Sequence, residues 1–207
     1  MAFVVSHADG ADTAESGYYL SVNRGKRSIA LDLSSEEGQA VVRDIAARSD
    51  IVLENFKAGT LARYGLAYED LKAVNPAIIY CSITGFGLTG PRRDQAAYDF
   101  MIQAMGGLMS VTGERDDAPG GGPQKVGVPI VDMMTGMYAT IAVLAALARR
   151  NETGEGEQID IAMLDVSVGF LANQGMNYLV SGTTPTRKGN KHPNIQPQDV
   201  FPVQDGH

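Results

Sequence analysis

The sequence predicts an α/β protein with a Rossmann-like parallel sheet flanked by helices. Short apolar segments alternate with helical patterns along the chain, as in sheets whose strands are joined by crossover helices. The segment 77–83 is almost entirely apolar, which is typical of a buried strand. A glycine-rich segment, 84–91, follows it directly. That is the end of a strand at which ligands collect in open α/β sheets.

The first expected strand and helix lie between residues 28 and 48. The segment 28–33 is expected to be a strand because every second residue is apolar. Ser34 is expected to cap a helix over 36–48, since Glu37 stands three residues later and completes a capping box. The helix is expected to bury three apolar side chains, Val41, Val42 and Ile45.

The alternation continues to about residue 180. A strand is expected over 50–54, a short helix over 68–75 that Pro76 stops, and the buried strand over 77–83. The segments beyond are expected to form a helix weakened by two adjacent glycines (98–109), an exposed loop (118–124), a long helix beginning at Met133, a strand (158–163) and a helix (165 to about 179). The polar tail is expected to enter a strand near residue 200.

Composition limits the classes of protein that fit. The 207 residues are 44% hydrophobic, enough for a sizeable core, and the net charge of −7 argues against nucleic acid as a general partner. The single cysteine, Cys81, excludes an intramolecular disulfide and fits a reducing cytoplasm. One cysteine and three histidines argue against a zinc site. We therefore expect a cytoplasmic protein that uses no metal.

Neither a signal peptide nor a membrane span is expected. No basic region accompanies the apolar N-terminal residues. The apolar stretch 133–147 comes nearest to a span, but Thr135, Gly136 and Thr140 interrupt it, and it is shorter than about 20 residues.

The carboxylate of Asp132 is the principal candidate for chemistry. It interrupts an apolar run, 128–147, where a strand or loop gives way to a long helix. If Met133 begins that helix, Asp132 accepts backbone N–H bonds at the positive end of the helix dipole, which keeps the carboxylate ionised and nucleophilic. A plain helix cap fits the residues equally well. The residues alone leave both interpretations open.

Other polar side chains carry weaker signals. The phenol of Tyr98 suits a hydrogen bond to an oxyanion or a substrate carboxylate, but a lone tyrosine is more often a packing residue. Two basic clusters beside expected strand ends suit anion contacts or a solvated surface: Arg24, Lys26 and Arg27, and Lys57 with Arg63. The glycine-rich segment lacks the Gly-Lys-Ser/Thr ending of a phosphate loop. It is a weak nucleotide motif.

A series of segments resembles the class III CoA-transferase family, which includes formyl-CoA transferase and carnitine-CoA transferase. They occur in the family's order, at 23–33, 50–59, 61–65, 82–91, 98–113, 132–147 and 154–163. The resemblance implies that Asp132 is the catalytic aspartate. It would attack a donor acyl-CoA to form a mixed anhydride and then carry CoA as an aspartyl thioester, so that neither ATP nor a metal is needed.

The resemblance also implies a coenzyme A site and a second active-site residue. Tyr98 matches a tyrosine near the thioester. The positions that match the family's CoA-binding part are Leu31, Asp32, Leu33, Ser34, Asn55, Phe56, Lys57 and Arg63. The expected small-molecule partners are an acyl-CoA and a carboxylic acid. The expected protein partner is a second copy of the chain, because chains of this family interlock as homodimers.

The same resemblance predicts how the chain is divided. We expect an atypical lead over 1–15, a CoA-binding large domain over 16–180 that lacks its first βα unit, and a linker with the start of a small domain over 181–207. The fold is thus expected to be an incomplete large domain of the family, truncated at both ends.

Two alternatives to the transferase are kept. One is an α-methylacyl-CoA racemase or epimerase, which belongs to the same superfamily and abstracts an α-proton with a His/Asp pair. Tyr98 stands where that histidine would lie, and tyrosine is a poor base at neutral pH, which favours transfer. The other is a non-catalytic fragment that binds CoA or a partner chain.

Overall fold

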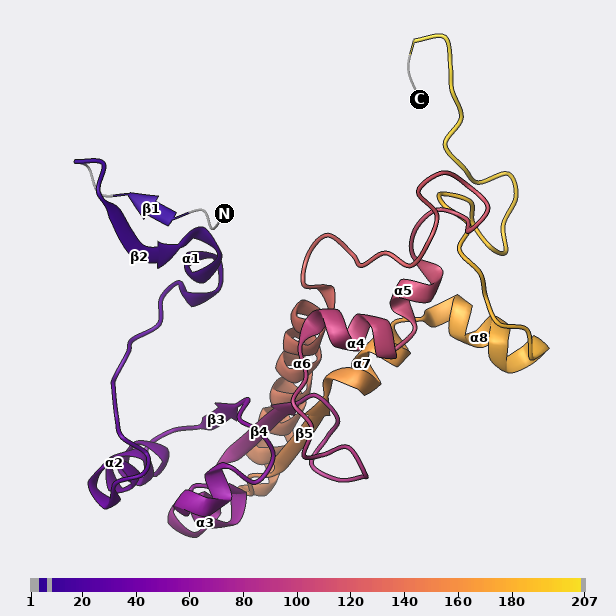
Figure 1. Cartoon of the computed structure of the whole chain (residues 1–207). Coiled ribbons are helices and arrows are strands. Elements are labelled where there is room, and N and C mark those ends of the chain that lie inside the picture. Colours follow the sequence, from indigo (N-terminus) through magenta and orange to yellow (C-terminus); the bar gives the residue numbers. More distant parts are fainter. Residues whose placement is uncertain (1–3, 7–8, 206–207) are drawn as a thin grey trace. The chain divides into compact units, whose positions relative to one another are not determined.

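The computed structural model describes residues 4–6 and 9–205, and the chain divides into two compact units, residues 1–33 and residues 34–207 (Figure 1). Each unit is described by itself. The division falls at neither of the boundaries expected near residues 15 and 180, and those domain boundaries stay predictions.

The first unit is a hairpin followed by a short helix. Strands β1 (Val4–Ser6) and β2 (Asp12–Ser16) pair antiparallel and lead into α1 (Gly17–Asn23). Ser16 caps α1, because its hydroxyl accepts the N–H of Tyr19 at 3.1 Å. The strand predicted over 28–33 is wrong, since these residues have irregular backbone. An alternating pattern forms a strand only where a neighbouring strand offers hydrogen bonds.

The second unit begins with α2 (Glu36–Ala46), close to the predicted helix. The cap is Ser35 rather than Ser34, because the Ser35 hydroxyl accepts the N–H of Gly38 at 3.0 Å. The predicted burial is also wrong: Val41 and Ile45 are 37% and 47% exposed. Gly38 and Ala46 are buried instead, on a helix that packs beside α3 (Tyr68–Val74).

A parallel three-stranded sheet organises this unit and confirms the predicted fold class. The strands β3 (Ile51–Glu54), β4 (Ile79–Thr84) and β5 (Gln158–Ala162) lie in the order β3-β4-β5. Leu53 pairs with Cys81, which pairs with Ile159. The central strand is buried along almost its whole length, as its apolar sequence predicts. Burial raises the pKa of the Cys81 thiol to about 11, which keeps it protonated and inert at neutral pH.

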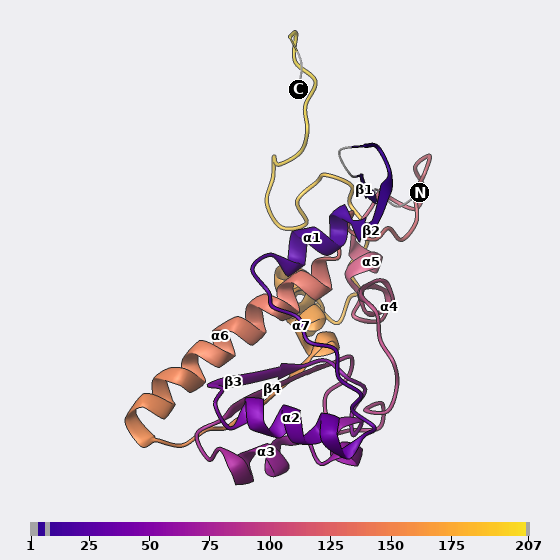
Figure 2. The same cartoon turned by 90° about the vertical axis from the view of Figure 1, so that its left-hand side faces the viewer.

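Helices cover both faces of the sheet (Figure 2). On one face, α3 follows the 3-10 turn η1 (Leu61–Tyr64), and Tyr68 of α3 packs edge-on against Tyr80 of β4. The long helix α6 (Ile130–Thr153) lies along β4 and β5 on the opposite face.

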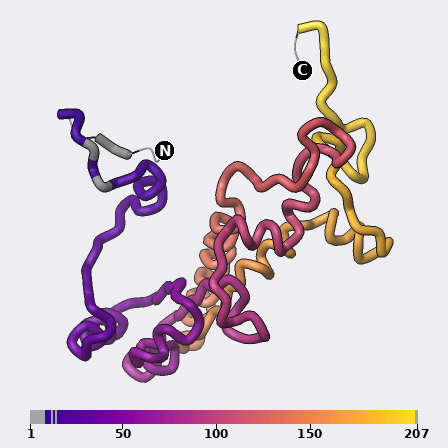
Figure 3. Tube along the Cα trace, in the orientation of Figure 1, coloured from indigo at the N-terminus to yellow at the C-terminus, as the bar shows by residue number. Residues whose placement is uncertain are grey.

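The remaining helices are shorter than the sequence suggests. The segment 98–109 forms α4 (Asp99–Met105) and α5 (Leu108–Val111), because Gly107 takes a left-handed conformation (φ +87°) between them. The last predicted helix is likewise divided into α7 (Met163–Gly169) and α8 (Ala172–Ser181). Beyond α8 the chain runs without a helix to residue 205 (Figure 3). In place of the strand predicted near residue 200 there is a single bridge residue, Val203, followed by a turn.

The helix α6 extends beyond the apolar stretch 133–147 at both ends. Its 24 residues include a window of mean hydropathy 1.7, so it is long and apolar enough to cross a membrane by length and composition alone. The core helix of a soluble protein passes the same test. This property therefore does not assign α6 to a membrane.

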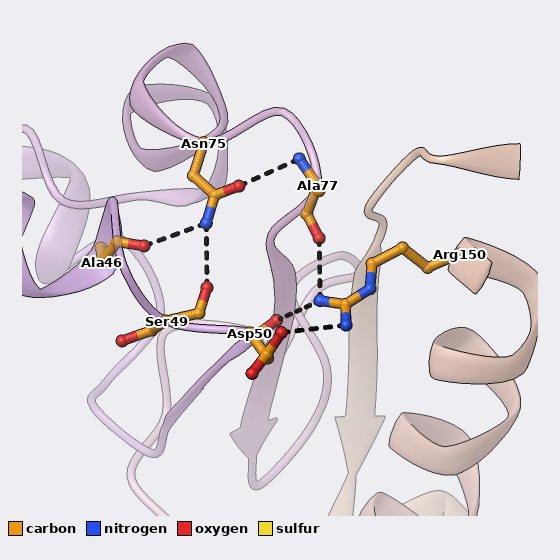
Figure 4. A network of polar contacts seen from close by, with 6 residues as sticks. All are labelled: Ala46, Ser49, Asp50, Asn75, Ala77 and Arg150. Atoms are coloured by element: carbon orange, nitrogen blue, oxygen red, sulfur yellow. Dashed lines mark hydrogen bonds and ion pairs between the residues drawn. The ribbon is translucent and has the colours of Figure 1, made fainter.

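A polar network joins the amino-terminal ends of β3 and β4 to the end of α6 (Figure 4). The guanidinium of Arg150 donates to the backbone oxygens of Asp50 and Ala77 and pairs with the Asp50 carboxylate at 3.0 Å. Beside it, the Asn75 amide donates to the carbonyls of Ala46 and Ser49 and accepts the N–H of Ala77. The network holds α2, α3 and α6 on the sheet.

Replacement of Asn75 by alanine is expected to lower the free energy of unfolding by about 2 kcal/mol, because it leaves three partly buried backbone groups without their partner. Urea unfolding followed by circular dichroism measures the change. The matched control is Asn151→Ala, at an exposed position in the last turns of α6, which should stay within about 0.5 kcal/mol of the parent. Equal stability of the two variants would contradict the role given to the network.

Candidate active site

The first turn of α6 lies at the carboxyl edge of the sheet. Val131, in this turn, packs in one cluster with Ile83 near the end of β4, whereas Arg150, near the other end of the helix, contacts the residues that precede β3 and β4. The helix therefore runs antiparallel to the strands. Its amino-terminal end meets the edge at which ligands bind in open α/β sheets.

Asp132 lies inside this first turn and not before it. The helix begins at Ile130 after Pro129, so the predicted start at Met133 is wrong and Asp132 is the third helical residue. Pro129 has no side-chain hydrogen-bond acceptor, and the acceptor comes from another helix. Oδ1 of Asp99, at the start of α4, accepts the N–H groups of Val131 at 2.8 Å and Asp132 at 3.3 Å.

The electrostatic environment of Asp132 differs from the predicted one. Backbone N–H bonds to its own carboxylate are predicted from the sequence, but Asp99 accepts the two N–H groups named above. Partial loss of hydration raises the pKa of Asp132, and the negative charge of Asp99 raises it further. The residue is nevertheless exposed, so a substrate can reach it. A carboxylate that binds a proton more tightly is also a stronger nucleophile.

Asp99 is itself held by a buried amide. Gln103, fully buried one turn later on α4, donates from Nε2 to Oδ2 of Asp99 at 2.6 Å. Its Oε1 accepts the N–H of Val126 at 2.9 Å, in the loop that precedes α6. Neither Asp99 nor Gln103 is among the candidates from the sequence. The acid and the amide stand four residues apart on a predicted helix, which is a visible signal, but their partners lie 23 to 33 residues away in the sequence.

Tyr98 directly precedes Asp99, which bonds the backbone of the first turn of α6. It is the N-cap residue of α4, and its side chain is 74% exposed. The backbone of Gly85 lies very close to Ala97, the residue before Tyr98. A Cβ atom on Gly85 would lie 2.1 Å from Cβ of Ala97. The first glycine of the glycine-rich segment therefore allows β4 to lie against the chain that enters α4.

Two backbone N–H groups of the glycine-rich segment are hydrogen-bonded to side chains of the same chain. The N–H of Gly87 donates to Oγ1 of Thr84 at 2.9 Å, and the N–H of Leu88 donates to Oδ2 of Asp160 on β5 at 2.9 Å. A phosphate would have to displace these two acceptors. The weak nucleotide motif is thus better explained as a packed loop. After Asp99 and Gln103, Asp160 is a third residue that is not among the candidates from the sequence.

A cleft of about 290 Å³ lies on the α3 face of the sheet, near the ends of β3 and β4. Its charged lining residues are Glu54, Lys57, Arg93 and Asp94, and its apolar wall includes Leu61, Tyr68 and Tyr80. Lys57 is the one expected CoA-binding residue that lines it.

The eight expected CoA-binding residues are divided between the two compact units. Asn55, Phe56 and Arg63 are exposed and do not line the cleft, although they lie in the stretch 55–63 that supplies several of its lining residues. Leu31, Asp32 and Leu33 end the first compact unit, and Ser34 begins the second. Their roles stay predictions. Within the part of the chain that the structure describes, no group of three or more acidic, histidine or cysteine side chains is placed to hold a metal ion.

Comparison with known proteins identifies the family. The model of CoA-transferase family III matches residues 5–207, so the chain belongs to that family. It is 52% identical over 202 residues to succinate–glutarate CoA-transferase of Agrobacterium fabrum, covering 98% of this chain and 49% of that protein. It is 41% identical over 193 residues to human succinyl-CoA:glutarate CoA-transferase, covering 93% and 43% respectively.

A solved structure shares the fold. A CaiB/BaiF family protein from Brucella suis is 52% identical, with a TM-score of 0.85, over 98% of this chain and 52% of that one. The chain thus spans about half the length of the relatives it matches.

Proposed function

We propose that the chain carries the acyl-accepting aspartate of a CoA-transferase that moves CoA between dicarboxylic acids. The observation that supports this most directly is Asp132: an exposed carboxylate with a raised pKa, in the first turn of the helix at the carboxyl edge of the sheet. The relatives named above act, by name, on succinate and glutarate or their CoA esters. Two further relatives are named succinyl-CoA:mesaconate CoA-transferases.

The proposed reaction proceeds through Asp132. Its oxygen attacks the thioester carbon of the donor, the C–S bond breaks, and CoA leaves as the thiolate. The thiolate then attacks the Asp132 carbonyl of the mixed anhydride, which releases the donor acid and leaves an aspartyl-CoA thioester. The acceptor carboxylate repeats the two steps in reverse and regenerates Asp132. Charge and atoms balance without a metal or ATP.

The other predicted residues and partners belong to the same proposal. Tyr98 is proposed to contact the thioester from its exposed position at the start of α4. The proposed CoA contacts are Leu31, Asp32, Leu33, Ser34, Asn55, Phe56, Lys57 and Arg63. A homodimer, a cytoplasmic location and the domain division at about residues 15 and 180 are further parts of the proposal. Family membership supports them.

A trapping experiment tests the function. The chain is incubated with succinyl-CoA and then with hydroxylamine or borohydride, and the peptides are mapped by mass spectrometry. An adduct on Asp132 is expected. An unmodified Asp132 in a chain that exchanges the α-protons of an acyl-CoA would replace transfer with the racemase alternative. CoA binding with neither adduct nor exchange would support the non-catalytic alternative.

Replacement of Lys57 by alanine is expected to weaken CoA binding about 5-fold to 10-fold, because one ammonium contact to an anionic ligand is lost from the cleft. Isothermal titration with CoA measures the change. Lys72→Ala is the matched control, since Lys72 lies over the ring of Tyr68 on α3 and not in the cleft lining. An equal loss of affinity in both variants would indicate a general effect of charge and remove Lys57 from the site.

A further inference from the structure

Asp99 occupies an unusual position between two helices. Asp99 lies in the first turn of α4, yet its Oδ1 atom accepts two N–H groups in the first turn of α6. Pro129, at the N-cap position of α6, supplies no side-chain acceptor. The first turn of the helix that carries Asp132 is thus capped by an acid from elsewhere in the chain.

The Asp99 carboxylate has a fixed orientation. Its Oδ2 atom accepts the amide N–H of Gln103, and Gln103 is fixed in turn by the N–H of Val126. Because Gln103 is fully buried and both ends of its amide are bonded, it has one way to face Asp99. All three hydrogen bonds to the Asp99 carboxylate come from N–H donors, two on Oδ1 and one on Oδ2, so both of its oxygens are held.

The charge of Asp99 acts on Asp132. Acidic residues stand in the first turns of two helices that pack against α6, namely Asp99 on α4 and Asp165 on α7. Asp99 is the one that hydrogen-bonds the first turn of α6 and raises the pKa of Asp132. Formation of an anhydride or a thioester on Asp132 would remove one of the two negative charges.

We propose that Asp99, held by Gln103, is a positioning residue for Asp132: it anchors the backbone of the first turn of α6 and disfavours the free carboxylate relative to the acylated form. The catalytic part of this inference rests on the proposed function. The structural and electrostatic part does not depend on the proposed function, because it concerns the chain without substrate. Asp99 thereby has a role that does not require contact with the substrate.

The first test measures the resting chain. Carbon-13 NMR of aspartate-labelled protein, with Asp132 assigned from the Asp132→Asn spectrum, reports the pKa of Asp132 directly. Asp99→Asn is expected to lower this pKa, because the neighbouring negative charge is removed. Amide exchange at Val131 and Asp132 is expected to be faster in Asp99→Ala, which lacks the cap. An unchanged pKa in folded Asp99→Asn would overturn the proposal.

Asp165→Asn is the matched control. It removes one negative charge from the first turn of the neighbouring helix α7 without touching the α6 cap. The pKa of Asp132 and the two amide exchange rates are expected to stay at their parent values. If Asp165→Asn lowers the pKa as much as Asp99→Asn does, the effect is one of net charge and the specific role of Asp99 is refuted.

The second test measures transfer. Asp99→Asn is expected to lower kcat about 10-fold to 100-fold with little change in KM for the acyl-CoA, because the charge that disfavours the free Asp132 carboxylate is removed while the binding surface is kept. Parent-like kcat in Asp99→Asn would overturn the catalytic part. If the parent itself neither transfers nor forms an adduct, the proposed function fails, whereas the NMR and exchange results still decide whether Asp99 positions Asp132.

Discussion

Asp132→Asn is expected to abolish transfer, lowering kcat by about 10⁴-fold or more while leaving CoA binding largely intact. The amide keeps the shape of the side chain but provides no nucleophilic carboxylate. Transfer of CoA from succinyl-CoA to glutarate, with CoA affinity measured by titration, separates the two effects. Asp165→Asn, in the first turn of α7, is expected to keep parent-like turnover. Equal turnover by Asp132→Asn and the parent would refute the nucleophile assignment.

The same variant carries a prediction for stability. The folded-state pKa of Asp132 is raised above its unfolded value, so the folded chain prefers the protonated acid. This stabilisation is fully present below the unfolded pKa and is lost as the pH rises through the folded pKa. Asp132→Asn is therefore expected to be more stable than the parent at neutral pH. This gain in the free energy of unfolding is expected to vanish at about pH 3, below the unfolded pKa of an aspartate. Lower stability of the variant at neutral pH, measured by urea unfolding, would contradict this electrostatic account.

Gly156→Ala is expected to destabilise the fold by about 3 kcal/mol or more. Gly156 precedes β5, and its N–H donates to the carbonyl of Pro76 at 3.0 Å. A Cβ atom there would lie 2.0 Å from the backbone oxygen of Ile78 and 2.6 Å from the carbonyl carbon of Ala77. Because backbone atoms cannot turn aside as a flexible side chain does, the pairing of β5 with β4 has to shift. Urea unfolding measures the loss.

Gly136→Ala is expected to stabilise the fold, in contrast to Gly156→Ala. Gly136 lies within α6 with open space around the position of a Cβ atom. Alanine there is expected to raise the free energy of unfolding by about 0.5–1 kcal/mol, because glycine costs that much in a helix interior. If both glycine variants destabilise the fold equally, the close approach of Gly156 to β4 is not the cause.

Local patterns are sufficient for most of the helices and strands of the second unit. The apolar run at 77–83 corresponds to the buried central strand β4, and the two adjacent glycines mark the break between α4 and α5. The expected strand at 28–33 fails because its formation depends on a partner strand and not on its own alternation. The burial predicted for the apolar side chains of α2 is wrong for a related reason. The apolar face of a helix is buried only where another element covers it.

The sequence by itself determined the fold class, the family resemblance and the choice of Asp132, because each depends on residue types in a fixed order. Only the tertiary structure decided the environment of Asp132. Its cap comes from Asp99, 33 residues away, and the pKa of Asp132 is raised by partial loss of hydration and, in addition, by the charge of that second carboxylate. A hydrogen bond or a charge acts through space, so which groups reach Asp132 depends on how α4 and α6 pack and not on the residues beside it.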